Sequence, residues 1–354
     1  MTKAELDSIK ILPLEDSWYR KVKEKLDGIA KPLDGLGKFE HLIAQIGAIE
    51  KTTKISIQKK AVLVMCADNG VVEEQVSQSG KEVTLAVAKA MGVNNSSVGK
   101  MAAVAGVDVI PVDIGIDTDE VIPGVLPRKV TKGTKNFAKE PAMTEEEVLK
   151  AIETGIQLVQ QCHREGYEIL ATGEMGIGNT TTSTAVAAAL LDLEVEQVTG
   201  KGAGLTDEAL KRKCRVIKEA IEKYSLRDAD AFTILKTVGG LDIAGLTGVF
   251  IGAAIEQIPV IIDGVISAVA ALLAETLCKD AVNYMIPSHK SRELAETAIM
   301  KKLHLDPVLD ADMALGEGTG AVMMMSLLDV ALGVYLQGAS FANFEIEQYK
   351  RYEE

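Results

Sequence analysis

The sequence predicts an α/β protein built around a parallel β-sheet. Short apolar runs rich in β-branched residues alternate along most of the chain with glycine-rich turns and helical stretches, which is the pattern of βαβ units. Several of these runs end in polar residues or glycine, as strands do at the ligand-binding edge of open α/β sheets. Apolar residues make up 47% of the 354 residues but aromatic residues only 4%, so we expect a large aliphatic core.

The two ends of the chain differ from its middle. Residues 1–55 have a helical pattern, with a loop at Leu33–Gly37 before a second helix from about Lys38 to Glu50. Beyond about Leu305 the chain is helical again, most clearly over Ala321–Leu336. We therefore predict a large α/β domain over 56–304 and a smaller helical lobe formed jointly by 1–55 and 305–354.

Six apolar runs in the middle of the chain are candidate strands. They are Ala61–Ala67, Val107–Asp113, Glu168–Ala171, Thr233–Val238, Pro259–Asp263 and Val282–Ile286. Polar or glycine residues follow several of them, as in Asp68-Asn69-Gly70, Gly173-Glu174, Gly239-Gly240 and Asp263-Gly264. Because the carboxyl ends of parallel strands share one edge of a sheet, these residues should line one crevice.

Charge and cysteine content exclude several classes of protein. The formal net charge of −13 disfavours nonspecific binding to nucleic acid. The first ten residues contain no apolar signal-peptide core, and apolar stretches such as Val260–Leu273 are interrupted by polar residues and glycine. The four cysteines have no paired spacing, so neither a disulfide framework nor a zinc site is indicated. We expect a cytoplasmic protein that does not associate with membranes.

The segment Gly173–Thr182 is the first candidate for chemistry. It follows a predicted strand and precedes a predicted helix over Thr184–Leu191. Glycines at such a turn expose backbone N–H groups to an anion, and the helix N-terminus adds a favourable dipole. Asn179 and the threonines could cap the helix or donate to phosphate. The alternative is an ordinary strand–helix turn, and the segment is not a P-loop because no Gly-Lys-Ser/Thr follows.

Two further glycine clusters occur later in the chain. Thr199–Leu205 precedes a helix that carries Lys213, whose ammonium suits a phosphate or carboxylate; the alternative is a flexible connection with a solvated lysine. Leu315–Gly320 places Glu317 among glycines before an apolar helix, where a partly desolvated carboxylate could act as a general base. Alternatively, Glu317 only complements the helix dipole. Whether Glu174 and Glu317 converge does not follow from their spacing.

Other polar residues are weaker candidates. His289 lies in Ile286–Ser291 after a predicted strand, but a lone histidine there is more often a structural hydrogen-bonding group than a catalyst. Asp242 and Asp263 end predicted strands or turns and could orient loops rather than touch a substrate. The run Met323–Met325 is expected to pack in the core.

Eight segments, in order, resemble the motifs of the nicotinate-nucleotide–dimethylbenzimidazole phosphoribosyltransferase family, and they span nearly the whole chain. They are Lys31–Lys38, Cys66–Val71, Gly173–Thr181, Gly200–Leu205, Val238–Asp242, Asp263-Gly264, Ile286–His289 and Leu315–Gly320. The resemblance implies a Rossmann-like parallel sheet flanked by helices, a small lobe from both termini, and a homodimer or a paralogous heterodimer. It also implies a reaction in which nicotinate mononucleotide and 5,6-dimethylbenzimidazole give nicotinate and α-ribazole 5′-phosphate, the lower ligand of cobalamin-type cofactors.

The same resemblance assigns roles to individual residues. Glu317 would be the general base, and Glu174 would support the site near the ribose. Phosphate and ribose would be held by Gly176, Gly178, Asn179, Thr180, Gly202, Lys213 and Ser291. The pocket for the base would be formed by Ser79, Val87, Met175 and Leu315. No metal or organic cofactor is expected.

Three positions depart from the usual family pattern. Asn69 stands where many members have histidine, Gly80 where proline is common, and Val87 where a polar or longer side chain is frequent. Because this region is expected to contact the base, one hypothesis is that the enzyme accepts another benzimidazole, a purine or a phenolic compound. The sequence also leaves open simple hydrolysis of the nucleotide and a catalytically silent nucleotide-binding subunit.

Overall fold

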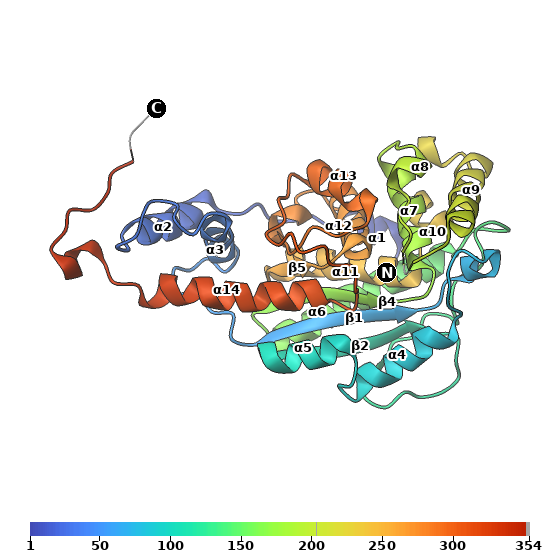
Figure 1. The fold of residues 1–354 in the computed structure, drawn as a ribbon, viewed down its shortest axis with the longest axis horizontal. Helices are drawn as coiled ribbons and strands as arrows, with labels where there is room; N and C mark the ends of the chain where they lie inside the picture. The colour runs from blue at the N-terminus through green and yellow to red at the C-terminus, as the bar shows by residue number, and fades with distance from the viewer. Residues whose placement is uncertain (203, 352–354) are drawn as a thin grey trace.

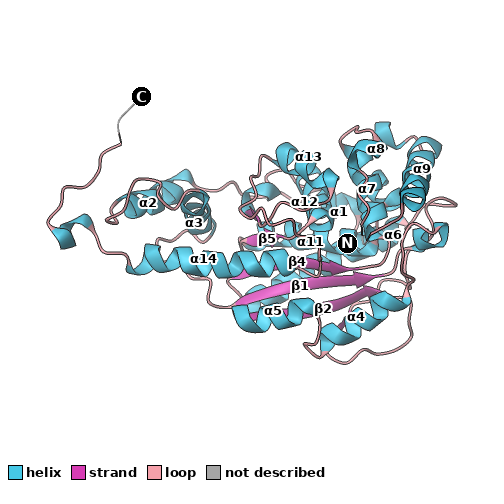
Figure 2. Ribbon diagram, viewed as in Figure 1, coloured by secondary structure: helices cyan, strands magenta, loops and turns pink. Residues whose placement is uncertain are grey.

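The computed structural model describes residues 1–202 and 204–351, and its centre is a six-stranded sheet (Figure 1 and Figure 2). Its strands are β1 (Lys60–Ala67), β2 (Val107–Gly115), β3 (Leu126–Pro127), β4 (Ile169–Met175), β5 (Val260–Ile262) and β6 (Met285–Pro287). They lie in the order β3-β2-β1-β4-β5-β6, with all neighbours parallel. This is the Rossmann strand order, which reverses between β1 and β4. The predicted fold class is confirmed.

Helices surround this sheet and form both ends of the chain. They are α1 (Lys3–Asp7), α2 (Asp16–Asp27), α3 (Lys38–Ile49), α4 (Glu82–Gly92), α5 (Ser97–Ala105), α6 (Glu145–Arg164), α7 (Asn179–Leu190), α8 (Val195–Val198), α9 (Asp207–Lys223), α10 (Ala231–Val238), α11 (Leu241–Glu256), α12 (Val265–Leu277), α13 (Leu294–Leu303) and α14 (Thr319–Gln337). Short 3-10 helices are η1 (Gly70–Glu74), η2 (Leu226–Asp228), η3 (Ala281–Tyr284) and η4 (Phe341–Phe344).

Strand β1 is buried on both faces and divides the core into two layers. Its alternate side chains point to opposite sides, as the two-residue period of a strand requires. Leu63 and Met65 belong to the cluster that includes side chains of α6, α7, α11 and α12. Val62 and Val64 belong to the cluster that includes side chains of α3, α5 and α14. This double burial explains why the strand is an uninterrupted apolar run.

Two strand predictions need correction. Thr233–Val238 lies in helix α10, not in a strand, because Asp230 caps the helix by accepting the N–H of Thr233 at 3.0 Å. The prediction of a strand over Val282–Ile286 is wrong for its first part, which lies in η3, because β6 begins only at Met285. Both runs are short and apolar, and such runs do not separate strand from buried helix by pattern alone.

The segment that holds α2 and α3 lies beside the C-terminal segment, on the left in Figure 1, where α2 and α3 pack against each other and α14 runs toward them. The backbone N–H of Ala30 donates to the carbonyl of Ala339 at 2.8 Å, which joins the two segments directly. The first residues lie apart from them, since the N-terminus pairs with Glu153 of α6 and Leu6 of α1 packs in the core of the large part. Helix α14 also contacts α5 and β4 of the large part, so it belongs to both regions. The division at residues 56 and 304 stays a prediction.

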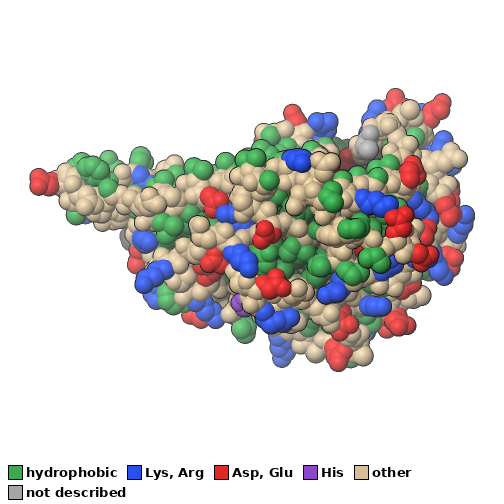
Figure 3. Space-filling model, turned by 90° about the horizontal axis from the view of Figure 1, so that it is seen from below, with side chains coloured by type: hydrophobic (Ala, Val, Ile, Leu, Met, Phe, Trp, Pro, Cys, Tyr) green, Lys and Arg blue, Asp and Glu red, His purple; other side chains and the backbone are tan. Residues whose placement is uncertain are grey.

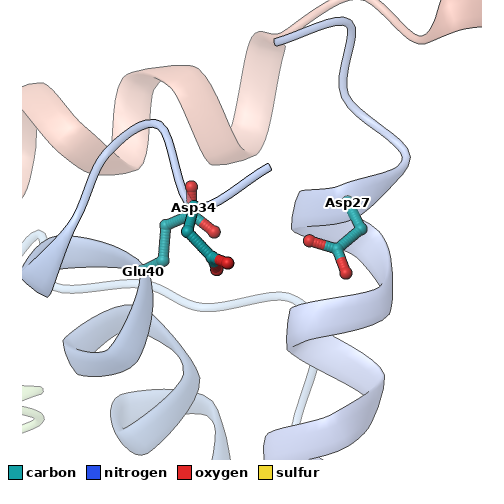
Figure 4. A group of neighbouring side chains, drawn as sticks. All are labelled: Asp27, Asp34 and Glu40. Atoms are coloured by element: carbon teal, nitrogen blue, oxygen red, sulfur yellow. The ribbon is translucent and has the colours of Figure 1, made fainter. Parts of the chain in front are cut away.

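A network of charges fastens the C-terminal tail to this end of the molecule. Asp27, Asp34 and Glu40 offer carboxylate oxygens within 4.8 Å of one another (Figure 4). The fully buried Glu40 pairs with Lys31 at 2.6 Å, and Arg351 pairs with Asp34 at 2.7 Å and with Asp27 at 2.9 Å. Hydrogen bonds from Arg351 hold the pKa of Asp34 well below its usual range. These carboxylates are therefore neutralised by basic side chains and are not arranged as free metal ligands.

Helix α14 is the one helix in the described residues that is long and apolar enough to cross a membrane by length and composition. Over the most apolar part of the helix, 56% of the residues are buried inside the protein. Its neighbours are β4 and α5, and its side chains join the core on that side of the sheet. Packing inside the protein therefore accounts for the apolar residues on one side of this helix, while Met323 and Val330 remain exposed.

Candidate active site

A cavity of about 220 Å³ lies at the carboxyl ends of β4, β5 and β6, beside the point where the strand order reverses. Its walls come from the end of β4, the first turn of α7, the start of α12, the loop after β6 and the loop before α14. The lining residues are Glu174, Met175, Gly176, Ile177, Asn179, Thr180, Gly202, Asp263, Gly264, Val265, Ile266, Ser267, His289, Ser291, Glu293, Ala314, Leu315, Gly316 and Glu317. The crevice predicted from the strand ends is thus present.

Glu174 and Glu317 converge in this cavity although they lie 143 positions apart in the sequence. Gly173 allows the approach: a Cβ there would lie 2.6 Å from the carbonyl oxygen of Glu317. A Cβ on Gly316 would lie 2.9 Å from Oε1 of Glu174, so the second loop also passes directly over this carboxyl group. The glycines on both segments therefore permit two backbones to meet at the carboxylates.

The backbone at Glu317 has an unusual conformation. Gly316, Glu317 and Gly318 all have positive φ angles, of 84°, 60° and 89°. A residue with a side chain rarely occupies this region, and such conformations cluster at functional sites. The half-buried Glu317 accepts a hydrogen bond at Oε2 from the N–H of Val98, at the start of α5, at 3.0 Å. The flanking glycines thus set the direction in which its carboxylate points.

Glu174 is held in a cluster of buried acids. Asn179 donates its Nδ2 to Oε2 of Glu174 and, at 3.1 Å, to Oδ2 of Asp242. Burial raises the pKa of Glu174 to about 8, and the nearby charges of Asp242, Asp263 and Glu317 act in the same direction. Burial also raises the pKa of Asp242 to about 6. Near neutral pH, Glu174 can therefore carry a proton and act as a hydrogen-bond donor.

Asp263 anchors the loop that carries Glu317. Its two carboxylate oxygens accept the N–H groups of Gly318, at 3.2 Å, and of Ala321, at 2.9 Å. A side chain from the end of β5 thus caps helix α14 from outside the helix, which is a favourable place for a carboxylate. Burial nevertheless raises the pKa of Asp263 to about 7. The expectation that Asp263 orients a loop agrees with these contacts, although Asp263 also lines the cavity.

The Gly173–Thr182 segment forms a helix start different from the predicted one. Helix α7 begins at Asn179 rather than at Thr184, and its N-cap is Gly178 with φ of 91°. No side chain caps it, because its N-cap residue is a glycine, and the side chain of Asn179 is turned toward Glu174 and Asp242. The N–H groups of Asn179 and Thr181 donate to the carbonyls of Gly176 and Gly178, at 3.1 and 2.9 Å, so the helix dipole and the N–H of Thr180 are what this helix start offers to an anion. Gly176 and Thr180 line the cavity, whereas Gly178 lies behind it against Val72.

Lys213 supports this wall from behind. It is fully buried on α9, and its Nζ donates to Oγ1 of Thr180 at 3.0 Å and to the carbonyl of Gly200 at 3.2 Å. Burial lowers its pKa to about 8. Among the ion pairs of the described residues, none involves Lys213. The solvated alternative for Lys213 is therefore wrong, and its contact with the site runs through Thr180.

The Gly200–Leu205 motif and the loop after β6 meet on the same side. Ala203 of this motif lies outside the described residues. Gly202 donates its N–H to Oε1 of Glu293 at 3.1 Å, and Ser291 accepts the N–H of Glu293 at 3.2 Å. Gly202 and Ser291, both assigned to phosphate and ribose, therefore lie together at the cavity wall.

Only two of the four residues assigned to the base pocket line the cavity. Met175 and Leu315 line the cavity. Ser79 and Val87 do not; Val87 is on α4 and packs against the core, and Ser79 lies in the loop before that helix. Helix α4 still touches the site, because Oγ1 of Thr84 accepts the N–H of Ile177 at 3.1 Å.

Some residues of the site were not singled out from the sequence. Val265, Ile266 and Ser267 line the cavity at the start of α12, and Glu293 lines it after β6. The glycine before Val265 was the available signal for the first group, since a strand end followed by glycine marks the ligand edge. His289 is buried, contacts Oγ of Ser288 at 2.9 Å, and has a pKa lowered by burial, in agreement with a structural role.

Comparison with known proteins gives consistent results. A family model described as "Phosphoribosyltransferase" matches residues 11–346. The nicotinate-nucleotide–dimethylbenzimidazole phosphoribosyltransferase of Acetivibrio thermocellus is 45% identical over 93% of this chain and 94% of its own length. The protein of the same name from Clostridium acetobutylicum is 43% identical over 95% of this chain and 96% of its own length.

Solved structures give the same grouping. The crystal structure of CobT from Thermus thermophilus superposes with a TM-score of 0.89 at 33% sequence identity, and the match covers 94% of this chain and all of that one. The chain therefore belongs to the phosphoribosyltransferase family whose members are named nicotinate-nucleotide–dimethylbenzimidazole phosphoribosyltransferases.

Proposed function

We propose that this protein is a pentosyltransferase that moves the phosphoribosyl group of nicotinate mononucleotide onto 5,6-dimethylbenzimidazole or a related base. The products are nicotinate and α-ribazole 5′-phosphate, and the reaction contributes the lower ligand of a cobamide. The observation that carries this proposal is the meeting of Glu174 and Glu317 beside the N-terminus of α7 in one cavity. The relatives that are 43–45% identical bear the name of this reaction.

The chemistry needs a base and a positioned nucleotide. A nitrogen of the incoming azole forms a bond to C1′ of the ribose, while the bond from C1′ to the pyridinium nitrogen breaks and its electron pair neutralises the departing ring. The azole loses its N–H proton, and we assign Glu317 to accept it. A well-placed general base contributes about 100- to 10,000-fold to the rate. Glu174, with a pKa of about 8, is assigned to donate a hydrogen bond toward the ribose.

The phosphate group is assigned to the opposite wall. The backbone of Gly176, the first turn of α7 at Asn179 and Thr180, and the N–H of Gly202 offer donors there. Ser291 adds a hydroxyl, and Lys213 supplies positive charge behind Thr180. Holding both reactants in register can lower the barrier by up to about 7–11 kcal/mol, so phosphate binding contributes to rate as well as to affinity.

The base is assigned to the side of the cavity formed by Met175 and Leu315. Leu315 is 52% exposed at the cavity mouth, so it is available to cover an aromatic ring. Ser79 and Gly80 lie in the loop before α4 and Val87 lies on α4, whereas Asn69 follows β1 and donates its Nδ2 to the carbonyl of Ile177 at 3.4 Å. They would shape preference among benzimidazoles, purines and phenolic compounds if this helix moves over the bound base.

The decisive experiment is product analysis. The purified chain is incubated with nicotinate mononucleotide and, separately, with 5,6-dimethylbenzimidazole, unsubstituted benzimidazole, adenine and a cresol. We expect release of nicotinate that depends on the added base, together with the matching riboside phosphate. Release of nicotinate and ribose phosphate at the same rate without any base would identify a hydrolase instead. Nucleotide binding without turnover on any base would identify a silent subunit.

We further propose that the protein works in the cytoplasm as a dimer. An apolar surface formed by α5 and α14 supports the dimer: Val104 is 91% exposed, Val330 73% and Met323 42%. Figure 3 views the molecule from the side on which α4 and α5 lie in Figure 1, and hydrophobic side chains gather there between scattered charged ones. Large apolar patches of this kind usually mark an interface. The partner would be a second copy or a paralogue.

A further inference from the structure

Glu293 lies in the part of the cavity that the proposed function assigns to the substrate phosphate. It follows β6 and precedes α13, and its side chain lines the cavity. Its Oε1 accepts the N–H of Gly202 at 3.1 Å. Its Oε2 lies so close to Gly200 that a Cβ on that residue would collide with it. The carboxylate is thus seated against the backbone of the Gly200–Gly202 turn.

The surroundings of this carboxylate are those of an anion site. We define the anion seat as the N–H of Gly202, Oγ1 of Thr180, Ser291 and Nζ of Lys213. Thr180 and Ser291 line the same wall as Gly202, and Lys213 reaches the wall by donating to Thr180. The negative charge of Glu293 is also felt by Lys213, whose pKa it raises against the larger effect of burial.

We propose that Glu293 occupies the anion seat before substrate binds and competes with the 5′-phosphate of the nucleotide for it. This inference rests on the proposed function, because that function places the phosphate here. A carboxylate and a phosphate offer the same kind of acceptor oxygens to the same donors. Two anions in one seat repel each other, so the side chain must turn away when the phosphate enters.

Glu293 has the freedom to leave. It is the N-cap residue of α13 but makes no side-chain cap bond, so turning it costs that helix nothing. Its side chain is partly exposed. Its carboxylate accepts one hydrogen bond, from the N–H of Gly202, and is attracted by the more distant charge of Lys213. Glu296, its neighbour three residues on, is by contrast buried and accepts the N–H of Ser291. Glu293 therefore acts on affinity and selectivity for phosphate, and Glu296 maintains the loop.

The test uses substitutions at Glu293 in the full chain. Glu293→Gln keeps a carbonyl oxygen that can accept the N–H of Gly202 but removes the charge, and Glu293→Ala removes the group. Glu208→Gln, at an exposed position on α9, changes the net charge equally and is the matched control. For each variant, the KM for nicotinate mononucleotide and the Kd for inorganic phosphate, by calorimetry, are measured, with the melting temperature.

Removing an internal competitor raises the apparent affinity by the reciprocal of the fraction of time for which the seat was free. If Glu293 holds the seat for roughly two-thirds to nine-tenths of the time, both Glu293 variants should lower the KM and the phosphate Kd about three- to ten-fold. The control should change neither. The Kd for inorganic phosphate reports on the anion seat without any transfer reaction. This measurement therefore tests the inference even if the protein does not make a riboside phosphate.

Other results overturn it. A KM that rises in both variants would mean that Glu293 binds the substrate, through its ribose hydroxyls for example. Unchanged KM and Kd would mean that the carboxylate never competes. If Glu293→Ala lowers the melting temperature and weakens phosphate binding while Glu293→Gln behaves as wild type, Glu293 serves only to order the Gly200–Gly202 turn.

Discussion

The carboxylate of Glu317 accepts the backbone N–H of Val98 at 3.0 Å. Val98 is in the first turn of α5, a helix that lies against α14, and Glu317 directly precedes Gly318, the N-cap residue of α14. The proposed general base is therefore oriented by a helix from a distant part of the chain.

Replacing Glu317 separates binding from chemistry. Glu317→Ala should retain nucleotide binding and lose turnover by at least about 100-fold, the low end for a general base. Glu317→Gln is the sharper variant, because its amide oxygen can still accept the N–H of Val98 and so preserve the loop. Both losses should appear in kcat measured at saturating nucleotide and base. Unchanged turnover in either variant would remove Glu317 from the mechanism.

Asp263 should act on the reaction through the position of Glu317. Asp263→Asn loses at least one of the two hydrogen bonds to Gly318 and Ala321, since an amide offers one acceptor oxygen. We expect a fall in kcat of about 10- to 100-fold, because small displacements of a catalytic group have effects of that size. Steady-state kinetics would reveal it, with the exposed Asp310→Asn as control. A normal kcat with a normal pH profile would contradict the positioning role.

The raised pKa of Glu174 makes stability depend on pH. The folded pKa of about 8 exceeds the ordinary glutamate value of 4.5, so the folded protein binds more protons than the unfolded chain between these values. The stabilising contribution of the protonated acid is complete below about pH 4.5 and is lost as the pH rises through 8. Glu174→Gln is neutral at all pH values.

The melting temperatures should follow this difference. Glu174→Gln should melt higher than the wild type at pH 8, and the advantage should shrink toward pH 5. Scanning calorimetry at the two pH values would measure it, with the exposed Glu219→Gln as control. An advantage that stays constant between pH 5 and pH 8 would show that Glu174 does not titrate with an elevated pKa.

If the apolar surface of α5 and α14 forms the dimer interface, a charged residue placed in it should convert the dimer to a monomer. Val104→Asp places a charge on its most exposed apolar residue, which should dissociate a dimer because buried unpaired charge is costly. Sedimentation velocity would detect the shift to a monomer. Val121→Asp, at an 85% exposed position in the loop between β2 and β3, is the control. A wild-type chain that sediments as a monomer at micromolar concentration would rule out this interface.

Much of the fold could be predicted from the sequence because its signals are local. Strand β1 is an apolar β-branched run between polar residues, and α14 is a long apolar helix after a glycine cluster, so both were predicted to within a few residues. The prediction of a strand over Thr233–Val238 was wrong because the helix cap formed by Asp230 outweighed the β-branched composition of this segment. Helix α7 starts earlier than predicted because Gly178, with φ of 91°, is its N-cap residue, and the threonines expected to cap it lie inside the helix.

The site was harder to predict because it depends on contacts between distant segments. The motifs named Glu174 and Glu317, but only the close packing of Gly173 and Gly316 brings them together. Burial of Lys213 and the turn of Glu293 toward Gly202 depend on how α9 and the loop after β6 fold over α7. Sequence spacing carries no information about such encounters. The roles of the individual residues remain predictions for the experiments above.

Helix α14 has a mechanical consequence. Its 19 residues span about 28 Å. The helix runs from the loop that carries Glu317, the proposed general base, to the end of the molecule where α2 and α3 lie. A tilt of only about 5° along a rod of that length displaces one tip by about 2.5 Å, and an error of about 1 Å at a reacting group can cost a hundredfold in rate. A contact at the far end of α14 would therefore alter the position of Glu317, and with it the rate of turnover, without touching either reactant.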